Sequence, residues 1–209
     1  MSTFSRSFLD DSMSTLARLD DRQIEEVVGV LASTRDKAGR IFFCGSGGGA
    51  GHSSHAACDF RKLAHIESYS VTDNVSELTA RVNDDGWDSS YAEWLRASRL
   101  ADRDCVFVFS VGGGSLERKI STNLVRAMQL AEEVGAAIVG VAGRDGGELR
   151  RRATACVVIP NLDERYVTAQ TEGMQALVWH LLVSHPTLSA MSAKWESETA
   201  SAATSAPPT

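Results

Sequence analysis

An excess of basic residues is absent from this chain, which has 21 Lys and Arg against 27 Asp and Glu and a formal net charge of −6. That balance argues against a nucleic-acid-binding domain, because such domains usually carry a basic stripe. It does not exclude an anionic substrate, since backbone amides at the start of a helix bind phosphate whatever the net charge of the protein.

Cysteine pairs and long apolar segments are missing as well. The four cysteines form no CxxC motif. We interpret Cys44, Cys105 and Cys156, which lie in or beside apolar runs, as small buried hydrophobic residues. The first residues, MSTFSRSFLDDS, do not have the basic-then-apolar order of a signal peptide, and no uninterrupted apolar run approaches about 18 residues. We therefore expect a cytoplasmic protein without a membrane segment.

The length and composition suit a single domain. The 209 residues are 43% hydrophobic and 23% charged, enough for one α/β domain that needs no disulfide or structural metal. Amphipathic stripes at residues 4–18 and from Ile24 to about Thr34, the second preceded by Asp20 and Gln23 in a capping arrangement, predict two helices before the first strand. We assign residues 1–36 to N-terminal helices for packing or oligomerisation and 37–191 to the main domain. The polar tail, 192–209, is expected to be disordered.

From residue 40 onward, short apolar runs alternate with helical patterns. Near-continuous apolar runs are typical of strands that are buried on both faces. Strands are expected at 40–45, 68–73, 104–110, 136–143 and 155–160, and helices at about 52–63, 74–82, 88–99, 116–134, 147–152 and 166–185. The alternation predicts an α/β fold with a doubly wound, five-stranded parallel sheet flanked by helices.

Two glycine-rich loops connect predicted strands to predicted helices. In an open parallel sheet, ligands bind beyond the carboxyl ends of the strands, and glycines at a helix start expose amide donors to an anion. The first loop reads GSGGGAG (45–51); it is not a secure dinucleotide fingerprint, because Asp73 lies farther along than the roughly 20 residues expected. The second reads SVGGGS (110–115). It would cradle phosphate between Ser110 and Ser115 at a helix start, the alternative being a plain turn with Ser115 as helix cap.

Two predicted helices carry imidazole and carboxylate groups. His55 and Asp59 are four residues apart and so share one helix face, and the last helix carries Glu172 and His180. Together these residues suit Zn²⁺ or another transition metal, and also proton transfer. On a straight helix Glu172 and His180 are separated by a rise of roughly 12 Å. They could share one centre if their side chains lean together, if Gly173 relaxes the helix, or if they belong to different subunits.

The segments GSGGGAGHSSHAACDF, TDNVSELTARVNDDGWD, FSVGGGS, GVAGRDGG and TEGMQALVWHLL together resemble SIS-domain proteins, and within them the phosphoheptose isomerases. The resemblance runs from about residue 8 to residue 186. It implies an aldose-ketose isomerase that converts sedoheptulose 7-phosphate to a heptose 7-phosphate through an enediol. It also implies a divalent metal, with zinc expected, and a homotetramer whose sites lie between subunits.

Residue roles follow from the resemblance. His55 takes the place of a metal-binding histidine, and Asp59 that of a glutamate that binds metal and acts as a base. Glu172 and His180 take the places of a glutamine and a histidine, so the four residues form the expected metal set, with Asp59 and His180 as the acid/base pair. We expect the substrate to contact Ser46, Gly47, Gly48, Asn83, Asp84, Ser110, Val111, Gly112, Ser115 and Glu172.

Some positions depart from the family pattern. Val111 and Gly112 replace two hydroxyl residues of the phosphate loop, and Leu63 replaces an arginine whose role would fall to Arg61 or Lys62. The product epimer, the pathway (envelope heptose or a secondary metabolite) and which member of the acid/base pair is the base all stay open. The competing interpretation is a non-catalytic SIS protein that binds a sugar phosphate or a protein partner. A replication-initiation-associated branch of that kind lacks the histidine and carboxylate set that this chain keeps.

Overall fold

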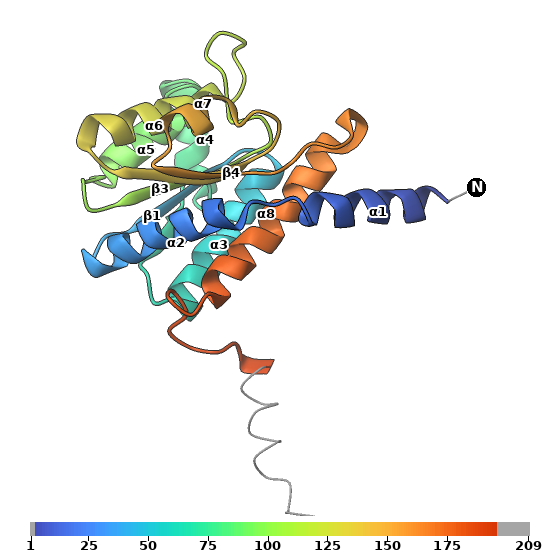
Figure 1. The fold of residues 1–209 in the computed structure, drawn as a ribbon. Coiled ribbons are helices and arrows are strands. Elements are labelled where there is room, and N and C mark those ends of the chain that lie inside the picture. The colour runs from blue at the N-terminus through green and yellow to red at the C-terminus, as the bar shows by residue number, and fades with distance from the viewer. Residues whose placement is uncertain (1–2, 196–209) are drawn as a thin grey trace, which may run out of the picture.

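The computed structural model describes residues 3–195, which form a parallel sheet between two layers of helices (Figure 1). The strands are β1 (Ile41–Gly45), β2 (Ser68–Ser70), β3 (Cys105–Ser110), β4 (Ala137–Ala142) and β5 (Ala155–Val158). All neighbours pair in parallel, in the order β2-β1-β3-β4-β5. The chain therefore builds outward from β1 in both directions, which confirms the doubly wound, five-stranded sheet predicted from the sequence.

Helices cover both faces of the sheet (Figure 1). One face carries α2 (Asp21–Asp36), α3 (Gly48–Leu63) and α8 (Val167–Ser184), which follows the short 3₁₀ helix η1 (Glu164–Tyr166). The other face carries α4 (Val75–Asp84), α5 (Ser90–Ala97), α6 (Thr122–Val134) and α7 (Gly147–Arg152). The first helix, α1 (Phe4–Leu16), extends away from this body and contacts α8.

The core lies on both faces of the sheet, as the apolar strand sequences predicted. Every residue of β1 and β3 is buried, and successive side chains point to opposite faces. Phe43 and Phe107 pack with residues of α2, α3 and α8. Phe42 and Val106 pack with residues of α5 and α6. The central strands are thus held rigidly, and the loops that follow them have a fixed base.

The cysteines are free thiols in different surroundings. Cys44 and Cys105 are completely buried, and burial raises the pKa of each thiol. Cys156, on the edge strand β5, is half-buried, and burial raises its pKa to about 12. The interpretation as buried hydrophobic residues is confirmed for Cys44 and Cys105 and holds in part for Cys156. Cys58 is exposed on α3.

The start of α2 shows one predicted contact and one unpredicted contact. Asp20 caps the helix as expected, because its side chain accepts a hydrogen bond from the backbone N of Arg22 at 3.1 Å. Gln23 does not take part in the cap. Its Oε1 instead accepts a hydrogen bond from the backbone N of Val158 at 2.8 Å and so fastens α2 to β5.

Two helices start at other residues than predicted. α3 begins at Gly48, before the predicted start at about residue 52, so the first glycine loop is short. α6 begins at Thr122 and not at about residue 116. The cause is a small antiparallel bridge in which the backbone N of Ser115 donates to the carbonyl of Ile120 at 2.9 Å, and the reverse bond forms at the same length. Ser115 therefore does not open the helix.

The predicted division of the chain at residue 36 stays a prediction, as does the disordered tail, which lies mostly outside the described residues.

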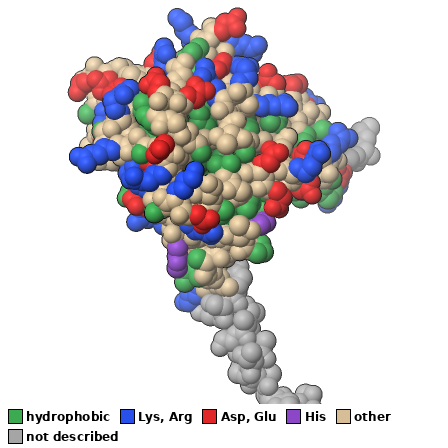
Figure 2. All heavy atoms as spheres, turned by 60° about the vertical axis from the view of Figure 1, so that its left-hand side comes forward, with side chains coloured by type: hydrophobic (Ala, Val, Ile, Leu, Met, Phe, Trp, Pro, Cys, Tyr) green, Lys and Arg blue, Asp and Glu red, His purple; other side chains and the backbone are tan. Residues whose placement is uncertain are grey.

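Acidic and basic side chains are intermingled over the face in Figure 2, with hydrophobic side chains between them. No helix within residues 3–195 is long and apolar enough to cross a membrane.

Candidate functional site

The first glycine loop lies against the carboxyl end of β3. β1 and β3 are paired neighbours, so the loops that follow them leave the sheet side by side. A Cβ on Gly49 would lie 2.8 Å from the carbonyl oxygen of Phe109, which is closer than real Cβ atoms come to a backbone oxygen. The absence of a side chain at Gly49 therefore lets the start of α3 approach the second loop.

The second loop is fixed by contacts of its own. Ser110 Oγ accepts a hydrogen bond from the backbone N of Gly113 at 3.0 Å. Gly113 has φ +71° and packs so tightly on the loop after β4 that a Cβ would lie 1.8 Å from the carbonyl oxygen of Gly146. Arg144 lies beside this loop, with its Cδ 3.9 Å from where a Cβ on Gly112 would be. This arrangement holds the backbone amides of the loop in place.

Ser115 lies elsewhere than its sequence pattern predicted. It sits in the bridged segment before α6, where its Oγ accepts a hydrogen bond from the backbone N of Arg118 at 3.2 Å. The helix amides that follow the second loop are those at the start of α6, after Ser121, which has φ +48°. The backbone N of Leu124 already donates to the carbonyl of Ser121 at 3.0 Å, so any anion site at this helix start would use the amides of residues 122 and 123 rather than Ser115.

A buried polar cluster that the sequence did not reveal supports Ser46. Asn123, which is 0% exposed, donates from Nδ2 to Ser46 Oγ at 3.2 Å. Among residues 3–195, its Oδ1 is the buried side-chain atom with no hydrogen-bond partner. Tyr91 donates to the carbonyl of Gly45 at 2.7 Å, and burial raises the pKa of Tyr91 to about 12 against the opposing effect of Ser46 and Asn123. Hydrogen bonds from Asn123 and Tyr91 thus fix the start of the first glycine loop.

His55, Asp59 and His180 converge between α3 and α8. One ligand atom from each lies within 4.8 Å of the other two. Asp59 Oδ2 is 3.5 Å from Nε2 of His55 and also 3.5 Å from Nε2 of His180. The side chain of Asp59 is only 13% exposed, whereas both histidines are about half exposed. Asp59 and His180 therefore meet within a single chain, and subunit sharing is not needed to join this pair.

A hydrogen bond to the backbone determines which nitrogen of His180 faces Asp59. Nδ1 lies 2.7 Å from the carbonyl oxygen of Ala176. A carbonyl only accepts, so Nδ1 carries the hydrogen. In a neutral ring Nε2 then presents a lone pair toward a carboxylate oxygen, and the two repel unless a proton or a cation lies between them. The cluster is therefore built to hold a proton or a metal ion.

The donor atoms of this cluster fit a transition metal. Two imidazole nitrogens and one carboxylate oxygen are a ligand set of catalytic zinc sites, which keep a further position open for water or substrate. Ligands bound at about 2.0–2.2 Å around a tetrahedral ion lie about 3.4 Å from one another, close to the 3.5 Å separations between Asp59 and the two imidazoles.

Glu172 lies apart from this cluster. The metal-compatible group within residues 3–195 contains His55, Asp59 and His180 but not Glu172. The Glu172 carboxylate instead lies beside the first glycine loop, because a Cβ on Gly48 would be 2.6 Å from its Cδ. α8 stays helical through Gly173. The four residues predicted as one metal set thus divide into a cluster of three and a carboxylate near the glycine loop.

Three buried or half-buried side chains beside the cluster were missed by the sequence reasoning. Trp179 Nε1 donates to Asp59 Oδ2 at 3.2 Å. Gln175 Nε2 donates to the carbonyl of Val141 at 3.0 Å, which leaves Oε1 to accept from His52 Nδ1 at 3.1 Å. Gln175 and Trp179 are four residues apart on an apolar helix, and a buried indole N–H usually finds an acceptor. That spacing was the available signal.

Other predicted site residues lie away from the cluster. Asn83 and Asp84 are exposed at the end of α4, where Asn83 Nδ2 donates to Asp84 Oδ1 at 2.7 Å. Arg61 donates to the carbonyl of Ser68 at 3.2 Å, and its guanidinium lies over the ring of Tyr69. Arg61 is thus engaged at β2, and its role in place of the missing arginine stays a prediction.

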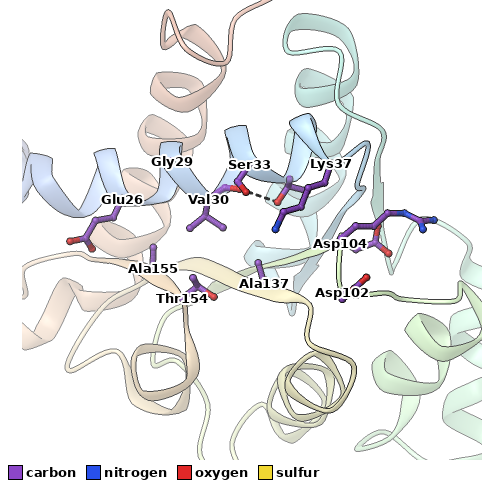
Figure 3. Close-up of a pocket in the computed structure, with 12 residues that line it drawn as sticks. Glu26, Gly29, Val30, Ser33, Lys37, Asp102, Asp104, Ala137, Thr154 and Ala155 are labelled. Carbon is purple, nitrogen blue, oxygen red and sulfur yellow. Dashed lines mark hydrogen bonds between the residues drawn. The ribbon is translucent and has the colours of Figure 1, made fainter.

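A pocket of about 420 Å³ opens at the opposite end of the sheet, between α2 and the strand starts (Figure 3). Glu26 and Lys37 of α2 line it, together with Asp104, Ala137 and Thr154. None of the predicted site residues lies in it. This hollow is therefore separate from the glycine loops and from the histidine cluster.

Comparison with known proteins shows what the chain is similar to. The SIS domain family model matches residues 7–143. Lincomycin biosynthesis protein LmbN of Streptomyces lincolnensis is 34% identical over 191 residues, which is 86% of this chain and 68% of LmbN. The phosphoheptose isomerase of Akkermansia muciniphila is 30% identical over 177 residues, 82% of this chain and 87% of that protein. The structure of phosphoheptose isomerase GmhA from Neisseria gonorrhoeae has a TM-score of 0.75 at 22% identity, covering 86% of this chain and 96% of GmhA, a likeness of fold.

Proposed function

Since the chain belongs to the SIS domain family and is a sugar-phosphate isomerase, we propose that it interconverts sedoheptulose 7-phosphate and an aldoheptose 7-phosphate. The observation that carries the proposal is the convergence of Asp59 Oδ2 with two imidazole nitrogens at 3.5 Å. The similarity to phosphoheptose isomerases supports a seven-carbon substrate.

The reaction requires a proton to move between adjacent carbons through an enediol. In our proposal Asp59 and His180 are the acid/base pair. Asp59 is largely sheltered from water, and the carbonyl of Ala176 holds His180 so that Nε2 faces the site. One of the two takes the proton from carbon, and the other carries the proton of the neighbouring oxygen. The arrangement favours neither residue as the base.

The phosphate is proposed to bind at the second glycine loop, through Ser110 and the amides of Val111 and Gly112. Val111 and Gly112 have no side-chain hydroxyl, but their backbone amides remain in place because the hydrogen bond between Ser110 and Gly113 fixes the turn. The polar part of the sugar is proposed to contact Ser46, Gly47, Gly48 and Glu172. Contacts with Asn83, Asp84 and Ser115 stay predictions from the sequence.

We propose that His55, Asp59 and His180 hold a divalent metal ion, with zinc as the expected one. When bound there, the ion would polarise the carbonyl oxygen of the sugar as a Lewis acid. Glu172, which the sequence included among the ligands, is assigned to the substrate instead, because its carboxylate lies beside Gly48.

A homotetramer, or at least a dimer, is also proposed. α1 extends from the body (Figure 1). It exposes more apolar surface than is usual for a helix that faces solvent. Its exposed hydrophobic residues are Phe4 (67%), Leu9 (50%), Met13 (56%) and Leu16 (44%). A second copy of the chain would cover these side chains. Light scattering tests this, and a monomer would refute it. The cytoplasmic location stays a prediction.

The substrate is tested by comparing phosphorylated ketoses of different length. We expect the highest kcat/KM with sedoheptulose 7-phosphate and a much lower value with fructose 6-phosphate, in a coupled or NMR assay. A preference for the six-carbon sugar would overturn the substrate assignment but not the isomerase class. Envelope heptose and secondary-metabolite pathways both stay open, and the likeness to LmbN is a reason to test the second.

A further inference from the structure

We propose that Trp179 is a positioning residue for Asp59. Its indole N–H would hold the carboxylate in the one orientation in which Oδ2 faces both His55 and His180. This inference rests on the proposed function in so far as Asp59 is taken to work in catalysis and metal binding. The hydrogen bond itself can be tested without either.

The contact between Trp179 and Asp59 is a charge-assisted hydrogen bond between two largely buried side chains. Trp179 Nε1 lies 3.2 Å from Asp59 Oδ2, Trp179 is 3% exposed and the Asp59 side chain 13%. The terminal torsion of an aspartate is broad, so side-chain geometry alone does not fix where its two oxygens point. Hydrogen bonds to an ionised group are stronger than neutral ones. The indole is therefore the group able to select one orientation.

The indole is itself held firmly. Its ring meets Phe109 of β3 edge-on, with centroids 5.7 Å apart, and lies 4.9 Å from the ring of His52. His52 is fixed in turn by Gln175, which bonds the carbonyl of Val141 in β4. The orientation of Asp59 is thus tied to the central strands of the sheet. A donor supported in this way is set before any ligand arrives.

The length of the Asp59 side chain makes this support more important. Asp59 carries its carboxylate on a single methylene, one fewer than a glutamate would have. A shorter side chain has less reach toward the two imidazoles, so a change in its orientation alters the site more.

The competing view is that Trp179 only fills space between α3 and α8. The two views separate in Trp179→Phe, which keeps an aromatic ring but has no donor.

The first measurement tests the hydrogen bond in metal-free protein. The indole ¹H–¹⁵N resonance of Trp179 is assigned by its loss in Trp179→Phe. In Asp59→Ala this resonance should move upfield, because the charged acceptor is gone. Trp94 provides the internal reference, since it packs on Phe42 at the other face of the sheet. A Trp179 resonance unmoved in Asp59→Ala would overturn the proposal.

The second measurement compares Trp179→Phe with Trp94→Phe as the matched control. Loss of a partner that orients a metal ligand typically costs 10–100-fold in metal affinity or activity. We expect Trp179→Phe to weaken zinc binding by about 10-fold or more in calorimetry, and to lower kcat by a similar factor with KM nearly unchanged. Trp94→Phe should leave both near wild type. A folded Trp179→Phe with wild-type zinc affinity and kcat would reduce Trp179 to a packing residue.

Failure of the proposed isomerase function can be distinguished from failure of the proposed positioning role of Trp179. If the wild-type protein isomerises no sugar phosphate, the proposed function fails, while the NMR and zinc measurements still decide whether Trp179 positions Asp59. If Trp179→Phe does not fold, the indole resonance is assigned by through-bond and NOE experiments on the wild-type protein. The shift in Asp59→Ala then decides alone, because that variant leaves the indole in place.

Discussion

A single methyl group added at Gly48 would test the role of Glu172. A Cβ built on this first residue of α3 would lie 2.6 Å from Cδ and Oε1 of Glu172 and 2.7 Å from Oε2. Non-bonded heavy atoms prefer separations of about 3.5–4.0 Å, so the carboxylate would have to move by about 1 Å. It can do so, because it is the end of a flexible side chain. The substitution therefore displaces Glu172 and leaves the core unchanged.

The expected effect is on activity and not on stability. A misplacement of about 1 Å can cost about 100-fold in rate, so we expect Gly48→Ala to lower kcat/KM between about 10- and 100-fold in a steady-state isomerase assay. Gly48 is the first residue of α3 and has no positive φ, and the added methyl meets only the end of a flexible side chain, so the melting temperature should not fall. Gly51→Ala is the matched control: it lies in the same helix, nothing lies within 4 Å of its added methyl, and it should keep full activity.

A double variant separates displacement of Glu172 from a direct clash with substrate. If the methyl acts through Glu172, then Gly48→Ala should cost little further activity in a Glu172→Ala background, because coupled residues are not additive. Wild-type kcat/KM in Gly48→Ala would refute the reasoning. An undiminished loss in the Glu172→Ala background would show instead that the methyl obstructs the substrate.

Three further predictions follow from the structure. Asp59→Asn and His180→Ala should each lower kcat by about 100-fold or more with unchanged circular dichroism, and wild-type-like turnover in either would remove that residue from the mechanism. Elemental analysis should find about one divalent transition metal per cluster, with activity lost on chelation; a metal-free preparation with full activity would contradict this. Asp104→Asn should cost about 3 kcal/mol in urea unfolding, because it breaks a buried ion pair with Arg40 at 2.7 Å. Burial opposes ionisation of Asp104, but hydrogen bonds from Arg40 and Ala101 outweigh it and hold the pKa of Asp104 below the usual value. The contribution of Asp104 to the free energy of unfolding is therefore present above the ordinary carboxyl pKa and is lost as the pH falls through the pKa of the folded state. An Asp104→Asn variant whose stability is as acid-sensitive as that of the wild type would refute this.

The fold could be predicted from the sequence because its strands are buried on both faces. Runs such as IFFCG and CVFVFS need no partner sequence to be recognised as strands, and parallel pairing follows from the helices between them. The start of α6 could not be predicted in the same way. It depends on the bridge between Ser115 and Ile120, a pairing of backbone segments that apolar periodicity does not encode.

The candidate site was predictable in its parts but not in its assembly. The spacing of His55 and Asp59 placed both on one helix face, and the rise along α8 already separated Glu172 from His180. Which of the two would meet Asp59 depends on how α3 and α8 pack together, and the structure gives this role to His180. Trp179 was missed for the same reason, because its acceptor lies on another helix.

The most direct test of the account follows sedoheptulose 7-phosphate by ¹H and ³¹P NMR with wild-type protein and Asp59→Asn in parallel, each supplied with zinc. We predict that an aldoheptose 7-phosphate accumulates toward equilibrium with the wild type and that Asp59→Asn forms it at least about 100-fold more slowly. No aldose from the wild type, or equal rates from the two proteins, would contradict it.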